Sequence, residues 1–152
     1  MKKGFTLLEL MIVLIILGVL ATLGVMQYQA AIEKARGAEA RQIIGQLRSQ
    51  CAGIYMNDPS ATGQGTMACD DQNMGIGATL GIPGPAAAQC RVTNFFFYTM
   101  TPGAAVGDSD VIFTATRCIA GGKTPQGGVN GNLTLNTDYA LGTDVWATTG
   151  GY

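Results

Sequence analysis

The sequence predicts an α+β protein in which one long N-terminal helix packs on an antiparallel sheet of three or four strands. Three observations lead to this class. An apolar run, Phe5–Val25, continues without a proline into a segment with one apolar face. A stretch rich in Gly and Ala follows, and after it come runs of β-branched and aromatic residues. Because such a sheet must bury its apolar face, the apolar face of the helix is its natural partner.

The first apolar run is long enough to span a membrane. At 1.5 Å per residue, Phe5–Val25 extends about 31 Å as a helix, close to one hydrocarbon thickness. A secretory signal would have a shorter apolar core and a small-x-small cleavage site. Lys2 and Lys3 lie on one side of the run, and the other side has no charge before Glu33. The positive-inside rule therefore places the N-terminus in the cytoplasm and the rest of the chain outside.

Glu9 is the single charge within this run. A carboxylate at the membrane centre costs roughly 2.5–3.5 kcal/mol, and an ionisable residue within a membrane span is by default a functional residue. An ordinary anchor helix would explain the flanking lysines and the apolar residues but not this carboxylate. We therefore expect Glu9 to have a partner.

The order Lys2-Lys3-Gly4 followed by Phe5-Thr-Leu-Leu-Glu9 closely resembles the class III signal of type IV pilins and of the pseudopilins of type II secretion. The resemblance is specific over Lys2–Val25, extends along the helix to Tyr55 and is thin beyond it. It implies the pilin fold, with a leader at residues 1–4. It also implies that a prepilin peptidase cuts between Gly4 and Phe5 and methylates Phe5.

The resemblance further implies a structural subunit that polymerises through its N-terminal helix into a type IV pilus. Glu9 would then pair with the free amine of Phe5 in a neighbouring copy, which offsets the desolvation of both charges and sets the register. The implied partners are other copies of the chain, the peptidase, the inner membrane and its assembly platform. The subunit would lie in the inner membrane before assembly and in the extracellular filament afterwards.

One residue departs from the family pattern. Met26 stands where many pilins have a helix-kinking proline. Without this proline, the kink that it would cause is not expected. Gly18 and Gly24 could still weaken the helix, by about 1 kcal/mol each relative to alanine.

Residues 26–56 are predicted to continue the helix as an amphipathic half packed on the head. Apolar residues recur at the i, i+3, i+4, i+7 spacing of a one-sided stripe. These residues are Ala40, Ile43, Ile44, Leu47, Cys51, Ile54 and Tyr55. Arg36, Arg41 and Arg48 are interpreted as a solvated flank or as contacts to neighbouring subunits, and Glu33–Arg36 is an i,i+3 pair worth a few tenths of a kcal/mol. Proline at position 59 ends the helix, giving a rod of roughly 78 Å.

Residues 57–152 form the predicted extracytoplasmic head. Residues 60–88 are predicted to be a long loop. The sheet is expected within residues 90–148. Its first two strands, Arg91–Met100 and Asp110–Ile119, would form a hairpin, Asn132–Leu141 would add a third strand, and Asp144–Thr148 a short edge.

The four cysteines are expected to form two disulfides in the oxidising compartment outside the membrane. A zinc site is less favoured because the cysteines are not closely spaced and the chain has no histidine. Of three possible pairings, folding the hairpin about Ala104 places Cys90 opposite Cys118. Cys51 then remains for Cys69, and this bridge would tie the 60–88 loop to the helix.

Composition argues against the other functional classes. Without histidine, no Ser–His or Cys–His catalytic pair can form, so neither an enzyme nor a cofactor is expected. Beyond Met56 three basic residues stand against seven aspartates, which disfavours nucleic-acid binding. The alternative within the family is a pseudopilin of type II secretion. Many major pseudopilins have a calcium site that includes C-terminal aspartates, and Asp138 with Asp144 matches this pattern only weakly. No metal is assigned here. The glycine-rich connections favour a pilin.

Overall fold

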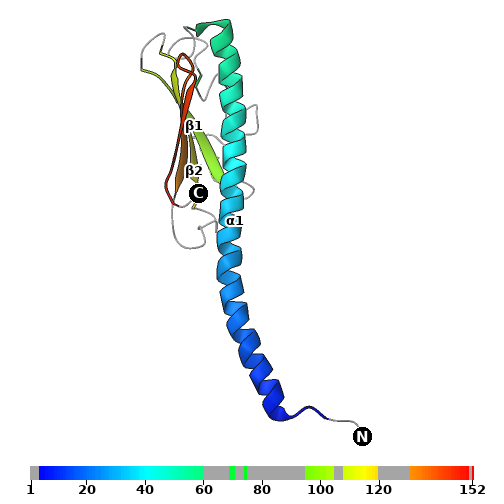
Figure 1. Ribbon diagram of the computed structural model, residues 1–152. Coiled ribbons are helices and arrows are strands. Elements are labelled where there is room, and N and C mark those ends of the chain that lie inside the picture. The colour runs from blue at the N-terminus through cyan, green and yellow to red at the C-terminus, as the bar shows by residue number, and fades with distance from the viewer. Residues whose placement is uncertain are drawn as a thin grey trace.

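The computed structural model describes residues 4–59, 69–70, 74, 95–104, 108–119, 131–150 and 152. In chain order the elements are α1 (Leu7–Asn57), β1 (Phe96–Pro102), β2 (Asp110–Arg117), β3 (Asn132–Asp138) and β4 (Thr143–Thr148). The sheet lies along the C-terminal half of α1, and the N-terminal half of the helix extends well beyond it (Figure 1). The predicted α+β class, a long helix packed on an antiparallel sheet, is confirmed.

The long helix has clear start and stop signals. Thr6 is its N-cap and forms a capping box with Glu9. At the other end the backbone N–H of Asp58 donates to the carbonyl of Ile54 at 2.9 Å, and Pro59 follows at once. The helix begins at Leu7, two residues later than predicted, and it runs through Met26 without a break.

The four strands form one antiparallel sheet in the order β1-β2-β3-β4. The third and fourth strands lie close to the predicted ranges, although β3 ends at Asp138 rather than Leu141. Residues 139–142 turn the chain, and Gly142 takes a φ of 66°, a left-handed conformation that glycine adopts without a Cβ clash. The predicted 60–88 loop lies outside the described residues apart from Cys69, Asp70 and Met74.

The predicted register of the first hairpin is wrong. Phe96 pairs with Arg117 and Pro102 with Val111, and the backbone N–H of Cys118 donates to Phe95 at 2.9 Å. Cys118 therefore lies across from Phe95 in the observed register. The difference of five residues is odd, so it turns the other face of the strand to the core.

Burial explains why the observed register is preferred. The predicted pairing would have turned Phe95, Phe97 and Thr99 toward the core, whereas the observed one buries Phe96, Tyr98 and Met100. Cys90 lies outside the described residues, so the Cys90–Cys118 pairing itself stays a prediction.

The core lies between the sheet and the predicted apolar stripe of the helix. Ala40, Ile44 and Leu47 have at most 1 % of their surface exposed, and they face buried residues of the middle strands. These sheet residues are Val111, Phe113, Ala115, Leu133 and Leu135. Cys51 continues the helical stripe and forms a disulfide with Cys69, with the two Cα atoms 5.8 Å apart. This is the pairing expected from the sequence.

Candidate functional site

The residues around the predicted cleavage point lie outside the helix and are exposed. Gly4 and Phe5 precede the N-cap, and the Phe5 side chain is 84 % exposed. The segment beyond them is apolar on every side, and an 18-residue window of it has a mean hydropathy of 2.6 with none of its residues buried. By length and composition the helix can cross a membrane, and within this chain nothing among the described residues covers that segment.

Glu9 has a local role that the sequence analysis missed. Its Oε2 atom accepts hydrogen bonds from the backbone N–H of Thr6 at 3.1 Å and from the Thr6 hydroxyl at 3.0 Å. The Thr6 hydroxyl in turn accepts from the Glu9 backbone N–H at 3.3 Å. Thr6-x-x-Glu9 is a capping-box signature that could have been found in the sequence. The carboxylate therefore helps to satisfy the free donors of the first helical turn.

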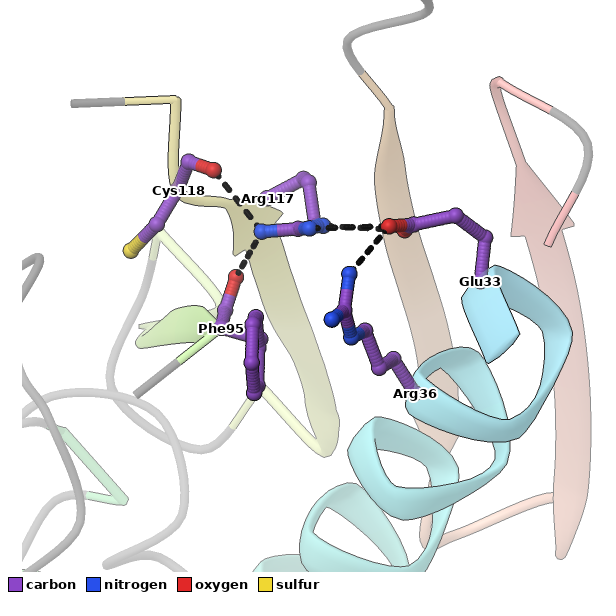
Figure 2. Close-up of polar contacts among 5 residues, drawn as sticks. All are labelled: Glu33, Arg36, Phe95, Arg117 and Cys118. Atoms are coloured by element: carbon purple, nitrogen blue, oxygen red, sulfur yellow. Dashed lines mark hydrogen bonds and ion pairs between the residues drawn. The ribbon is translucent and has the colours of Figure 1, made fainter. Parts of the chain in front are cut away.

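A second cluster ties the helix to the sheet at the base of the head. Arg117 of β2 donates to Glu33 of α1 through two atoms, Nη2 to Oε1 at 3.1 Å and Nε to Oε2 at 3.2 Å. Arg36 pairs with the same carboxylate and lies over the Phe95 ring, 3.9 Å from its centroid (Figure 2). Arg117 Nη1 donates to the carbonyl oxygen of Phe95 at 3.1 Å and to that of Cys118 at 2.8 Å. We call this cluster the helix–sheet clamp.

The clamp confirms the expected Glu33–Arg36 pair and corrects the expectation that Arg36 lies on a solvated flank. Glu33 is 8 % exposed and the Arg117 side chain is fully buried. Burial by itself would raise the pKa of the Glu33 carboxyl, but the hydrogen bonds and positive charges of Arg117 and Arg36 outweigh it and hold the pKa below its usual value. The carboxylate is therefore ionised and paired at neutral pH.

A smaller set of contacts joins the helix to the far end of the sheet. Arg48 Nε donates to Asp144 Oδ1 at 2.8 Å, and the same oxygen accepts from the Thr137 hydroxyl at 2.9 Å. The Tyr139 hydroxyl donates to the Arg48 carbonyl at 2.8 Å, and its ring stacks on Tyr55 with centroids 5.7 Å apart. The head is thus attached to α1 at two levels.

Asp138 and Asp144 do not converge on one point. Asp138 Oδ1 accepts from the Ser109 hydroxyl at 2.7 Å and from two backbone N–H groups of its own turn, whereas Asp144 faces Arg48. The Ser109 hydrogen bond, helped by the Leu141 and Ala140 N–H groups, lowers the pKa of Asp138. Within the described ranges no group of three or more potential ligands lies together to hold a metal ion.

The N-terminal segment and most of the chain match known bacterial proteins. Residues 1–25 match the family described as the prokaryotic N-terminal methylation motif. The chain is 31% identical over 127 residues to the type IV major fimbrial protein FimA of Dichelobacter nodosus, covering 83% of this chain and 79% of that protein. The chain belongs to the type IV pilin family.

Two further relatives match over a shorter part. One is the type IV major pilin protein PilE of Neisseria gonorrhoeae, 31% identical over 94 residues, or 62% of this chain and 53% of the relative. The other is a probable minor fimbrial protein of D. nodosus, 42% identical over 81 residues, or 49% of this chain and 48% of the relative. The alignments thus span about half the length of these two relatives. No solved structure matches the chain.

Proposed function

We propose that this chain is the structural subunit of a type IV pilus and polymerises through the N-terminal half of α1. The observation that carries the proposal is an apolar segment that none of the described residues covers, continuous with a helix half that is packed under its own head. An all-round apolar helix requires an apolar environment. The membrane would supply it before assembly, and the same segments of neighbouring copies would supply it in the filament.

Processing would convert the exposed N-terminus into an assembly contact. Cleavage between Gly4 and Phe5 by a prepilin peptidase would free the amine of Phe5, which the enzyme would then methylate. Both hydrogen bonds that the Glu9 carboxylate accepts in the capping box reach Oε2. Its other oxygen, Oε1, accepts none from the described residues. We propose that this oxygen meets the Phe5 amine of the next copy.

The proposed role is structural and not catalytic. The subunit would wait in the inner membrane with its N-terminus in the cytoplasm, and an assembly platform would move it into the extracellular filament. The pseudopilin alternative is not better supported, since Asp138 and Asp144 are engaged separately by protein donors.

The proposal is tested by the mass and N-terminal sequence of subunits in filaments sheared from the cell surface. We expect subunits that lack Met1–Gly4 and begin with methylated Phe5. Filaments whose subunits retain Lys2 would contradict the processing step. Absence of this chain from surface filaments, when it is abundant in the membrane, would contradict the structural role.

A further inference from the structure

One tyrosine lies against the helix at the base of the head, next to the helix–sheet clamp. The Tyr152 ring packs edge-to-face on the ring of Phe96 in β1, with the two centroids 5.5 Å apart. A Cβ added to Gly37 of α1 would lie 3.1 Å from Cδ1 of Tyr152, and one added to Gly131 would lie 2.4 Å from its Cε2. The ring thus contacts the helix and both sides of the sheet base, near the label C in Figure 1. We call Gly37, Phe96 and Gly131 the Tyr152 socket.

The packing of the ring explains the glycine at position 37. Glycine is less favourable than alanine in the interior of a helix. Gly37 is nevertheless buried, and a Cβ at this position would push the Tyr152 ring by a few tenths of an ångström. By contrast, a Cβ on Gly45 or Gly53, in the same half of α1, would meet nothing within 4 Å. The space at Gly37 is therefore matched to the ring.

Tyr152 is held in its socket by packing. The residue is half-buried, and Gly150 before it takes a φ of 83°, a conformation that glycine adopts without a Cβ clash. Burial, together with the charge of Glu33, raises the pKa of the phenol, although Arg117 acts against this. The phenol is therefore neutral at pH 7 and lies beside the clamp. A ring held in this way can leave its socket without breaking a covalent bond.

The far end of the head is attached to α1 more firmly. The Cys51–Cys69 disulfide ties the helix covalently to the head there. Arg48 and Tyr139 add an ion pair with Asp144 and a hydrogen bond to the helix backbone. Cys51 is the only cysteine of α1, so the base of the head has no covalent tie to the helix. The base can therefore separate from α1 while the far end stays attached.

From these contacts we propose that the head is hinged at its far end and that Tyr152 is the latch that keeps its base closed against α1. With the ring in its socket, the clamp is closed and the head has one orientation on the helix. With the ring out, water reaches the clamp and weakens its ion pairs, so the base can move away from α1.

The latch also has a consequence for assembly, which rests on the polymer proposed above. Copies that pack through the N-terminal half of α1 present their heads at regular intervals only if each head has the same angle on its helix. Glu33 and Gly37 lie where the covered half of α1 begins, so the latch sets this angle at the base of the head. A subunit without the latch should therefore assemble poorly although it folds.

The test measures how readily a reagent reaches a buried position at each end of the head, with the full chain in detergent. Ala40→Cys places a thiol at a fully buried position one helical turn from Gly37. Val111→Cys places one at a fully buried position of β2, opposite Thr137 toward the far end. The rate of maleimide labelling reports the opening of each end. We expect Tyr152→Ala to raise the rate at least tenfold at the first thiol and less than threefold at the second.

Two further variants test the hinge and the socket. Tyr139→Ala removes the same side chain at the far end, where the disulfide remains, so labelling of the Ala40→Cys thiol should change less than threefold. Gly37→Ala should raise that labelling rate at least threefold while the ring is present, because the new Cβ displaces the ring. In the Tyr152→Ala background it should cause no further rise, since there is no ring to displace.

The labelling results decide on the latch whether or not the chain forms filaments. Equal increases at the two thiols would show that Tyr152→Ala loosens the whole head, and no increase at the Ala40→Cys thiol would show that the ring does not hold the base. Either result overturns the latch. An equal effect of Gly37→Ala with and without the ring would overturn the socket.

The consequence for assembly has its own readout in cells that make the full chain. We expect Tyr152→Ala to lower the ratio of subunit in filaments to subunit in membranes at least fivefold, at an unchanged membrane level. A wild-type ratio would overturn this step and leave the latch itself to the labelling. If wild type forms no filaments at a normal membrane level, the proposed function fails and the labelling result still stands.

Discussion

The two halves of α1 share one continuous backbone and differ in what covers them. Apart from Glu9, Leu7–Val25 is apolar on all sides, and its large apolar side chains remain 48–76 % exposed. The half beyond Glu33 has a single buried stripe, which the sheet covers. The difference lies in the side-chain pattern, since an apolar stripe needs one partner surface and an all-round apolar helix needs a complete apolar environment. The first half therefore depends on partners outside the chain, whereas the second half has its partner within it.

Glu33 marks the border between these halves, because it is the first buried residue of α1. The clamp that it forms with Arg117 fixes the base of the head to the helix just where the uncovered half begins. Changes in the first half should thus act on assembly, and changes in the second half on the stability of the head.

The largest effect is expected for Glu9→Val. The variant should insert into the membrane at the wild-type level or above it, because it removes a costly charge. Filament yield should fall at least tenfold, since the amine of the next copy loses its carboxylate. The measurement is the ratio of filament to membrane subunit.

Thr6→Ala is the control that separates the two roles of Glu9. It removes the capping hydroxyl, at a cost of about 1 kcal/mol to the helix, but keeps the carboxylate. We expect filaments to form. An equal loss in both variants would mean that Glu9 acts by capping its own helix and not by pairing with a neighbour.

The next effect is expected for Arg117→Met, which leaves Glu33 buried without its main partner. Removing one member of a buried ion pair costs roughly 3–5 kcal/mol. Urea unfolding of the full chain in detergent, followed by the fluorescence of Trp146, should show this loss. Arg48→Met removes an ion pair whose side chains are 37 % and 34 % exposed, so it should cost only about 0–1 kcal/mol. Equal losses in the two variants would show that the clamp is no stronger than a surface pair.

A somewhat smaller effect is expected when the Cys51–Cys69 disulfide is removed by changing both residues to serine. The bridge closes a segment with a sequence separation of 18, which by chain entropy is worth about 3 kcal/mol. The urea midpoint should fall accordingly. Treating the double variant with a reductant should cause no further loss from this bridge, because the bridge is already absent. A midpoint equal to that of wild type would show that packing around Ala40, Ile44 and Leu47 holds the head without the bridge.

The sequence predicted the parts of the molecule that depend on local pattern. The span of α1, its buried stripe and the four strands follow from periodicities of 3.6 and 2 residues and from proline at position 59. The β1–β2 register does not follow from these patterns. The long connection between the two strands allows several pairings, and burial in the core decides which face of β1 points inward. Glu33 was missed for a related reason, since Arg36 is a nearby partner in sequence and Arg117 is distant from it. Thr6 and Glu9, by contrast, carried a local signal that could have been found.

The smallest effect concerns pH. It tests whether the ion pairs of Glu33, at the border between the two halves of α1, stabilise the head. Glu33 has a pKa below its ordinary value of 4.5 because the Arg117 and Arg36 interactions outweigh the effect of burial. A carboxyl with a lowered pKa in the folded state contributes stability that is present above its unfolded pKa and is lost as pH falls through the folded pKa. The urea midpoint of wild type should therefore be steady from pH 7 to about 5 and decline below about 4.5. Glu33→Gln should start lower at pH 7 and decline less steeply, because the residue no longer takes up a proton. Parallel declines would assign the acid sensitivity to other carboxylates, of which Asp138, with its own lowered pKa, is the first to examine by Asp138→Asn.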